Sequence, residues 1–308
     1  MRSIIRFLLI LICTLSAHGG EFLPGKKRIL FLGDSITYAG HYVDEIEAFL
    51  ITKYPDRKFE VIDCGLPSET VSGLSEAGHA GGKFPRPDVH ERLDRVLALV
   101  KPDVVFACYG MNCGIYLPFD ETRFAAYRAG MEKLRAKVKA AGADIIHLTP
   151  PVFDPLPIAK RVKPAESTKD GDMFEGYDGV LTRYAAWLVE QGKTNGWSVV
   201  DTHTAMADAI TDARKTNPAF TFANDGVHAN EAGHRVLAVA ALKGLGQAFD
   251  PETIPAAQRK LIRQRGRILC DAYLNAAGHK RPGMGKGIPV EEATAKAGEL
   301  DAAIRAAK

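Results

Sequence analysis

Four short groups of residues in this chain carry functional groups that can do chemistry. Ser35 and Gly65 follow the first two apolar runs, Asn112 follows a third, and Asp225 and His228 stand together much later. Serine, histidine and aspartate can form a nucleophile, its general base and the carboxylate that orients the base. Backbone N–H groups and an asparagine amide can stabilise an oxyanion. The set therefore predicts a hydrolase.

Ser35 lies where a predicted strand passes into a helix. The apolar run Arg28–Leu32 stops at Gly33 and Asp34, as is typical of a buried parallel strand that ends in a tight turn. Apolar residues then recur at helical spacing over 41–53. Unpaired N–H groups at a helix start can stabilise an oxyanion. Alternatively, Ser35 only caps the helix. We expect Asp34 to shape the turn.

Strand and helix patterns alternate along the chain. Strands are predicted at Arg28–Leu32, Phe59–Asp63, Val104–Tyr109, Asp144–Thr149 and Trp197–Asp201. Helices are predicted at His41–Lys53, Pro87–Val100, Asp120–Ala141, Tyr177–Asn195, Thr204–Thr211 and Asn230–Phe249. The alternation predicts an α/β/α three-layer, flavodoxin-like fold with a parallel sheet of about five strands. Ligands of such sheets bind outside the carboxyl ends of the strands, where the four groups would meet.

The composition is that of an ordinary soluble globular protein. Of 308 residues, 46% are hydrophobic and 25% charged, and the formal net charge is +3. The small net charge and the lack of a dense basic tract argue against a nucleic-acid partner. Five cysteines do not make a disulfide scaffold, and none has the spacing of zinc ligands. We expect no metal site.

The first twenty residues have the pattern of an export signal. A basic start precedes the apolar run Phe7–Leu15, and small residues follow up to Gly20. The run is too short for a membrane span, so we expect no stable membrane insertion after cleavage. A lipoprotein signal that uses Cys13 is disfavoured by the bulky Ile12 before it. The prediction is a signal peptide at 1–20 and a secreted or periplasmic protein.

The mature chain is predicted to hold a hydrolase domain at 21–250 and a helical C-terminal extension at 251–308 packed on it. The extension has two helical patterns on either side of Gly278–Gly287. Its length is marginal for an independent core. Its basic residues either meet polar or acidic substrate groups or form a solvated loop; they are His279, Lys280, Arg281 and Lys286.

In order and spacing, the four groups resemble the sequence blocks of the SGNH, or GDSL-type, hydrolase family. The first block is matched by Gly33–Thr37, the second by Gly65, the third by Gly110–Asn112 and the last by Asp225–His228, with Asn230 and Gly233 also fitting. The resemblance covers about 27–245. It implies a serine esterase that works through an acyl-enzyme, without metal or cofactor.

The resemblance also implies a role for each residue. Ser35 would be the nucleophile and His228 the general base, with Asp225 holding the other imidazole nitrogen. The oxyanion hole would consist of the N–H groups of Ser35 and Gly65 and the side-chain amide of Asn112. Each such donor typically contributes about 3 kcal/mol to transition-state stabilisation.

One position departs from the family pattern. The third block usually reads Gly-x-Asn-Asp, and here Cys113 occupies the place of the last aspartate. Because a thiol cannot accept the strong hydrogen bonds of a carboxylate, we expect the loop of Asn112 to be held less firmly. An inactive binding protein on the same scaffold is therefore one alternative. Acyl transfer with the same triad is another.

The substrate is predicted to be an ester of a small molecule or a polysaccharide. Export would place the enzyme among extracellular polymers. The stretch 160–176 is charged, and 73–88 is rich in Gly, Pro and His. Such loops suit hydroxyl-rich ligands, whereas a lipase or lysophospholipase, the remaining alternative, would need an apolar lid. We therefore expect deacetylation of a carbohydrate.

Overall fold

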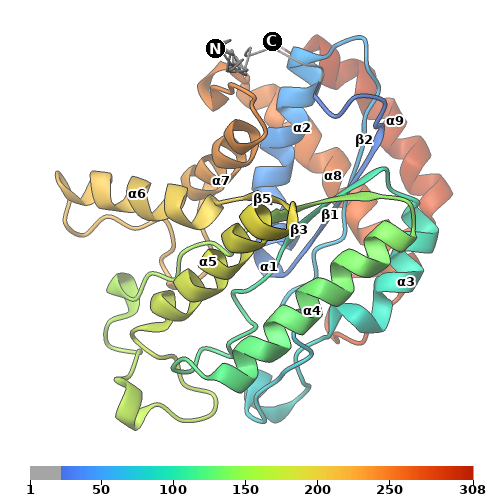
Figure 1. Ribbon diagram of the computed structural model, residues 1–308. Coiled ribbons are helices and arrows are strands. Elements are labelled where there is room, and N and C mark those ends of the chain that lie inside the picture. Colours follow the sequence, from blue (N-terminus) through green and yellow to red (C-terminus); the bar gives the residue numbers. More distant parts are fainter. Residues whose placement is uncertain (1–21, 308) are drawn as a thin grey trace, which may run out of the picture.

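A parallel β-sheet with helices on both faces forms the centre of the computed structural model, which describes residues 22–307 (Figure 1). The predicted signal peptide lies outside the described residues. Five strands follow the order β2-β1-β3-β4-β5. They are β1 Arg28–Gly33, β2 Glu60–Asp63, β3 Val104–Cys108, β4 Asp144–Leu148 and β5 Ser198–Val200. The expected α/β/α fold is confirmed, and each strand end lies within one residue of its predicted place.

The central strands are apolar because helices cover them on both faces. Every residue of β3 is buried, as is β1 after its first residue. Phe31 of β1 pairs with Phe106 of β3, and their rings stack with centroids 4.8 Å apart. All neighbouring strands are parallel, so the four chemistry-bearing groups leave the sheet at one edge.

Nine α-helices lie within the described residues. They are α1 Ser35–Ala39, α2 His41–Lys53, α3 Val89–Val100, α4 Glu121–Ala140, α5 Tyr177–Asn195, α6 Thr202–Arg214, α7 Glu231–Gly244, α8 Ala256–Ala277 and α9 Val290–Ala306. Short 3₁₀ turns occupy His79–Gly82, Leu156–Ile158, Ala165–Ser167 and Pro251–Thr253. In Figure 1, α4 and α5 cover one face of the sheet, and α2 and α7 cover the other. No helix of residues 22–307 is long and apolar enough to cross a membrane.

Two predicted helices have different bounds in the structure. The helix expected at Asn230–Phe249 stops at Gly244, and Gly246 follows with a left-handed φ of 76°. The helix expected at Thr204–Thr211 is longer, because Asp201 caps it by accepting a hydrogen bond from the Thr204 N–H. Both differences lie at helix ends, where a sequence pattern is least informative.

The sequence did not predict the short helix α1, and this changes the setting of Ser35. Ser35 is the first residue of α1 and not of the helix that begins at His41. Gly40, with a φ of 80°, ends α1 and begins α2, a conformation that glycine adopts without strain. Asp34 is the N-cap, since its Oδ1 accepts the Ile36 N–H at 3.0 Å. The expectation that Asp34 shapes the turn is confirmed.

The C-terminal helices pack against the hydrolase fold through buried ion pairs. Helix α8 contacts α2 and β2, and α9 packs on α8. Two carboxylates of α2 pair with arginines of α8: Glu45 with Arg259 and Glu47 with Arg265, both at 2.6 Å. Burial raises the pKa of Glu47, and Arg265 opposes this. Removing one partner of such a pair leaves a buried charge, so these contacts fasten α8 firmly.

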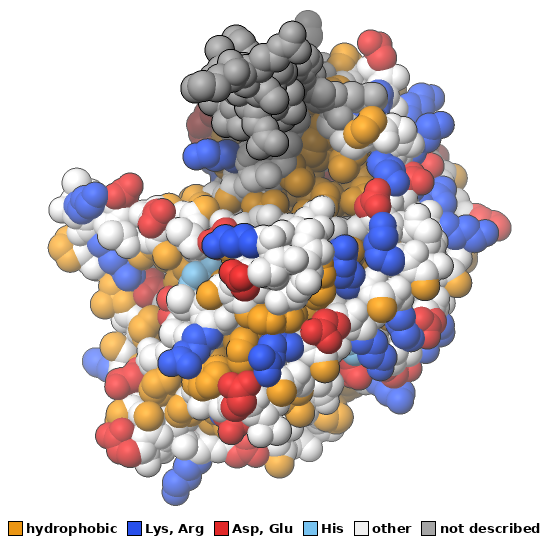
Figure 2. Space-filling model, viewed as in Figure 1, with side chains coloured by type: hydrophobic (Ala, Val, Ile, Leu, Met, Phe, Trp, Pro, Cys, Tyr) orange, Lys and Arg blue, Asp and Glu red, His pale blue; other side chains and the backbone are white. Residues whose placement is uncertain are grey.

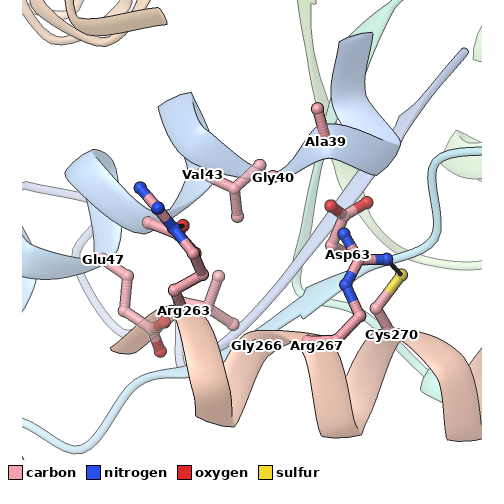
Figure 3. Close-up of a pocket in the computed structure, with 11 residues that line it drawn as sticks. Ala39, Gly40, Val43, Glu47, Asp63, Arg263, Gly266, Arg267 and Cys270 are labelled. Carbon is pink, nitrogen blue, oxygen red and sulfur yellow. Dashed lines mark hydrogen bonds and ion pairs between the residues drawn. The ribbon is translucent and has the colours of Figure 1, made fainter. Parts of the chain in front are cut away.

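Helix α8 also reaches the short helix that carries Ser35. Arg267 donates from Nη2 to the Tyr38 carbonyl at 2.7 Å, and its guanidinium lies 4.3 Å from the centroid of the Tyr38 ring. Figure 3 shows Arg267 beside Asp63, at a cavity of about 20 Å³ between α2 and α8. A cavity of this size has room for one water molecule. The end of α1 is therefore held from the C-terminal part of the chain.

Candidate active site

Ser35, His228 and Asp225 form one chain of hydrogen bonds. The Nε2 atom of His228 lies 2.8 Å from the Ser35 Oγ, and its Nδ1 atom lies 2.6 Å from the Asp225 Oδ2. Ser35 is the first residue of α1, just after β1, whereas the other two come from the loop before α7. This geometry allows imidazole to take the hydroxyl proton while the carboxylate holds the opposite ring nitrogen. The three residues thus lie together as the sequence predicts.

Asp225 and His228 shift each other's titration in opposite directions. Partial burial by itself would raise the pKa of Asp225, but hydrogen bonds from the His228 side chain and from the N–H groups of His228 and Val227 hold it well below its usual range. The hydrogen bond to Asp225 raises the pKa of His228, and desolvation only partly opposes this. Asp225 is therefore ionised at neutral pH, as an orienting carboxylate must be.

Asn112 lies just beyond β3, and its side chain is almost fully buried. Its Oδ1 accepts hydrogen bonds from Arg86 Nη1 at 2.9 Å and from the Tyr116 hydroxyl at 3.1 Å. Its Nδ2 donates to the Glu69 carbonyl at 3.2 Å. An amide nitrogen has two hydrogens, so one N–H of Asn112 has no acceptor among residues 22–307. The orientation suits the role of oxyanion donor that the resemblance implies.

Gly65 differs from its predicted role. Its N–H, expected in the oxyanion hole, donates instead to Asp63 Oδ1 at 2.7 Å. Burial raises the pKa of Asp63 to about 7, and the Gly65 hydrogen bond partly opposes this. A Cβ atom on Gly65 would lie 2.3 Å from the backbone nitrogen of Tyr38. Glycine is therefore needed here because the backbone of α1 passes so close.

We expect Gly65→Ala to misplace the nucleophile without removing any side-chain contact. The added methyl group must push α1 away, and a displacement of this order typically costs about 100-fold in kcat. Overpacking should also destabilise the protein by about 1–3 kcal/mol. Hydrolysis of p-nitrophenyl acetate and urea unfolding measure the two effects. Gly298→Ala is the control, because a Cβ in α9 at that site meets no atom within 4 Å. Wild-type kcat in the Gly65 variant would contradict this packing argument.

Ser68, on the same loop, was not identified from the sequence. It has a φ of 69°, a conformation that favours glycine, and within residues 22–307 no acceptor is hydrogen-bonded to its N–H. The next residue, Glu69, supplies the carbonyl that Asn112 binds. A non-glycine residue with positive φ is costly, and such residues cluster at functional sites. No sequence pattern marks this conformation.

Cys113 is not among the hydrogen-bond partners of the Asn112 side chain. The thiol is fully buried and accepts the Val71 N–H at 3.5 Å, and burial raises its pKa to about 11. It therefore joins the loops of the second and third blocks as a neutral group. The side chain of Asn112 is held by other partners, so its orientation does not depend on a carboxylate at position 113.

Arg86 and Glu76 are further residues near the site that were not identified from the sequence. Arg86 Nε and Nη2 lie 2.7 and 2.6 Å from the two carboxylate oxygens of Glu76, and its Nη1 reaches Asn112. Both residues belong to the long segment between β2 and α3, for which the pattern predicts no regular structure. Within residues 22–307, no group of three or more His, Cys, Asp or Glu side chains could hold a metal ion.

Comparisons with solved structures support the fold. BT4096, described as a gut microbial diltiazem-metabolizing enzyme, aligns with a TM-score of 0.57 and 23% identity over 72% of this chain. Only 48% of BT4096 is covered, so the chain spans about half its length. A catalytic mutant of Axe2, an acetylxylan esterase from Geobacillus stearothermophilus, aligns with a TM-score of 0.52 and 23% identity over 74% of this chain and 96% of Axe2. At these identities the likeness shows the fold alone.

The sequence itself shows the family. None of the curated proteins matches the chain significantly. The family model for GDSL-like lipases and acylhydrolases, however, matches residues 31–236, about two thirds of the chain. This span runs from β1 to the start of α7 and so includes every element that carries a residue of the site. The chain therefore belongs to the GDSL-like Lipase/Acylhydrolase family.

Proposed function

We propose that the protein is a serine esterase that removes short acyl groups, most simply acetyl, from a carbohydrate. In the first half-reaction, the Ser35 Oγ attacks the ester carbonyl while His228 Nε2 takes its proton, as their 2.8 Å separation allows. The tetrahedral intermediate then collapses, and His228 returns the proton to the leaving alcohol. Water, activated by the same imidazole, attacks the acyl-enzyme and releases the carboxylic acid.

The negative charge of the intermediate needs hydrogen-bond donors at the site. The second amide hydrogen of Asn112 is one donor, and the Ser35 N–H at the start of α1 is another. The N–H of Ser68 is a third candidate in place of that of Gly65, because it is unpaired among the described residues and belongs to the loop that Asn112 contacts. Asp225 remains ionised and stabilises the imidazolium.

The exposure of the catalytic side chains is the observation that best supports a carbohydrate substrate. The side chains of His228 and Asp225 are 51% and 46% exposed, so a bulky polymeric alcohol can reach Ser35. In the described part of the chain, Leu99 and Leu156 are the only large apolar side chains that are exposed. Figure 2 shows acidic and basic side chains mixed over one face of the molecule. A lipase needs a larger apolar surface to sit on lipid.

Two further points support a carbohydrate ester. Axe2, which shares the fold, is an acetylxylan esterase. The segment between β4 and α5 carries exposed charged side chains, among them Lys163, which pairs with Asp172 at 2.8 Å. Polar side chains of this kind match hydroxyl-rich substrates. Action outside the cytoplasm, on secreted or envelope polymers, is a proposal that rests only on the sequence of residues 1–20.

The test is an acyl-length series on the purified mature protein. A shallow acyl site gains about 0.8 kcal/mol per buried methylene until it is full. We expect kcat/KM on p-nitrophenyl esters to peak between acetyl and butyryl and to fall for octanoyl. Acetate should also be released from acetylated xylo-oligosaccharides, and an added sugar acceptor distinguishes hydrolysis from transfer. A profile that rises steadily to octanoyl would favour a lipase or lysophospholipase.

A further inference from the structure

Arg86 is a buried cation that reaches the site from a loop outside the four blocks. Its side chain is 7% exposed and that of its partner Glu76 is 6% exposed. Burial by itself would lower the pKa of Arg86, but the hydrogen bond to Glu76 and the nearby Tyr116, Glu76 and Tyr177 groups together raise it. The guanidinium also lies 5.3 Å from the centroid of the Tyr116 ring, so contacts on two sides fix its position.

The third nitrogen of this guanidinium is not needed for the ion pair. Nε and Nη2 bind the two oxygens of Glu76, whereas Nη1 donates to the Asn112 Oδ1 at 2.9 Å. Arginine presents its donors in a rigid plane, so the bond to Glu76 sets the direction of Nη1. The position of Asn112 Oδ1 is thus determined by a carboxylate that does not itself touch the reacting atoms.

This bond decides which way the amide of Asn112 points. Its oxygen receives two donors, Arg86 Nη1 and the Tyr116 hydroxyl, and its nitrogen meets the carbonyl of Glu69. If the amide were flipped, its NH₂ group would face the Arg86 guanidinium, donor against donor, and its oxygen would face the Glu69 carbonyl, acceptor against acceptor. A cation bonded to the oxygen also withdraws electron density from the amide, which makes the remaining N–H a stronger donor.

We propose that Arg86 is a positioning residue of the oxyanion hole, acting through the Asn112 amide, which it orients and polarises. The proposal rests on the function proposed above, in which that amide stabilises the oxyanion. Glu76 holds Arg86 in place and keeps the site's net charge from rising. Since the amide N–H meets a full negative charge on the substrate oxygen only in the transition state, losing Arg86 should lower kcat and leave KM nearly unchanged.

A double-mutant cycle tests this. On p-nitrophenyl acetate, Asn112→Ala should lower kcat by about 100–1000-fold, as losing one oxyanion donor does. Arg86→Met should lower kcat by about 10–100-fold, with KM within about threefold of wild type. The double variant should be no slower than Asn112→Ala, because Arg86 acts only through that amide. Losses that multiply would overturn the proposal, as would a raised KM at unchanged kcat.

Arg265→Met is the matched control, because Arg265 forms a buried pair with Glu47 at the interface of α2 and α8, away from the triad. It should lower the melting temperature about as much as Arg86→Met but leave kcat unchanged at temperatures well below melting, where α8 stays docked. Inhibition by methylboronic acid, whose tetrahedral adduct on Ser35 places an oxygen in the oxyanion hole, should weaken in parallel with kcat for the Arg86 variant alone.

Arg86→Lys decides the matter if the methionine variant does not fold. A lysine keeps the charge beside Glu76 but cannot bind Glu76 and Asn112 in one rigid plane. It should fold and still lose at least about tenfold in kcat. Wild-type kcat in this variant would reject the proposal. If Ser35→Ala or Asn112→Ala also kept wild-type kcat, the proposed function itself would fail; if only the Arg86 variants did, the proposed function would stand.

Discussion

Ser35→Ala is expected to lower kcat for p-nitrophenyl acetate by a factor of about 10⁴ to 10⁶, because the members of a triad act as a unit. Without the hydroxyl, His228 has no proton to take and no acyl-enzyme forms. The fold should be unchanged. Asp34 and not Ser35 caps α1, and the Ser35 hydroxyl bonds only to His228 among the described residues. The variant should therefore unfold at the wild-type urea concentration.

The same experiment separates the two interpretations of Ser35. If the residue were only part of a helix start, Ser35→Ala would lower stability and leave kcat within a few-fold of wild type. Ser198→Ala provides the comparison, since Ser198 begins β5 and is exposed. It should match wild type in both measurements. Activity retained in the Ser35 variant at unchanged stability would remove Ser35 from the mechanism.

Asp225→Asn should lower kcat by about 10⁴. The amide can present an N–H to His228 Nδ1, which selects the tautomer whose Nε2 carries a proton and cannot accept one from Ser35. It also removes the charge that stabilises the imidazolium. The backbone bonds of the loop would persist, since the side chain can still accept the N–H of Val227. Loss of activity without loss of structure, checked by circular dichroism, is the expected outcome.

The pH profile gives an independent readout of the same pair. The general base works when neutral, so kcat/KM rises with pH through the pKa of His228. The hydrogen bond to Asp225 raises that pKa above its ordinary value of 6.5, which places the acid limb of the wild-type profile above 6.5. In Asp225→Asn the limb should move to lower pH, because the anion is gone. If the acid limb lay at the same pH in both enzymes, Asp225 would not control the pKa of His228.

The sequence predicted the sheet accurately for a physical reason. The central strands β1 and β3 are buried on both faces and so appear as uninterrupted apolar runs. Because parallel strands share one carboxyl edge, the motif residues after them had to meet. The triad geometry follows from this topology. Ser35 and His228 are 193 residues apart in the chain but lie within hydrogen-bond distance.

What could not be predicted depends on contacts between irregular segments. The short helix α1 is set by a capping bond and a left-handed Gly40, which leave little trace in a five-residue pattern. Arg86 approaches Asn112 because the long loop before α3 folds back, and no periodicity describes such a loop. The hydrogen bond from the Gly65 N–H to Asp63 is seen only in the structure. These details are matters of side-chain geometry that a motif does not encode.

The bond between Arg267 and Tyr38 has a consequence for the order in which the molecule is assembled. It joins residues 229 positions apart, so the helix that bears Ser35 is fastened by a part of the chain that is synthesised late. Contacts of such long sequence separation form slowly, after the local ones. Esterase activity should thus appear only once α8 has docked, later than the secondary structure. A refolding chain will pass through a stage that has its sheet but does not yet turn over substrate.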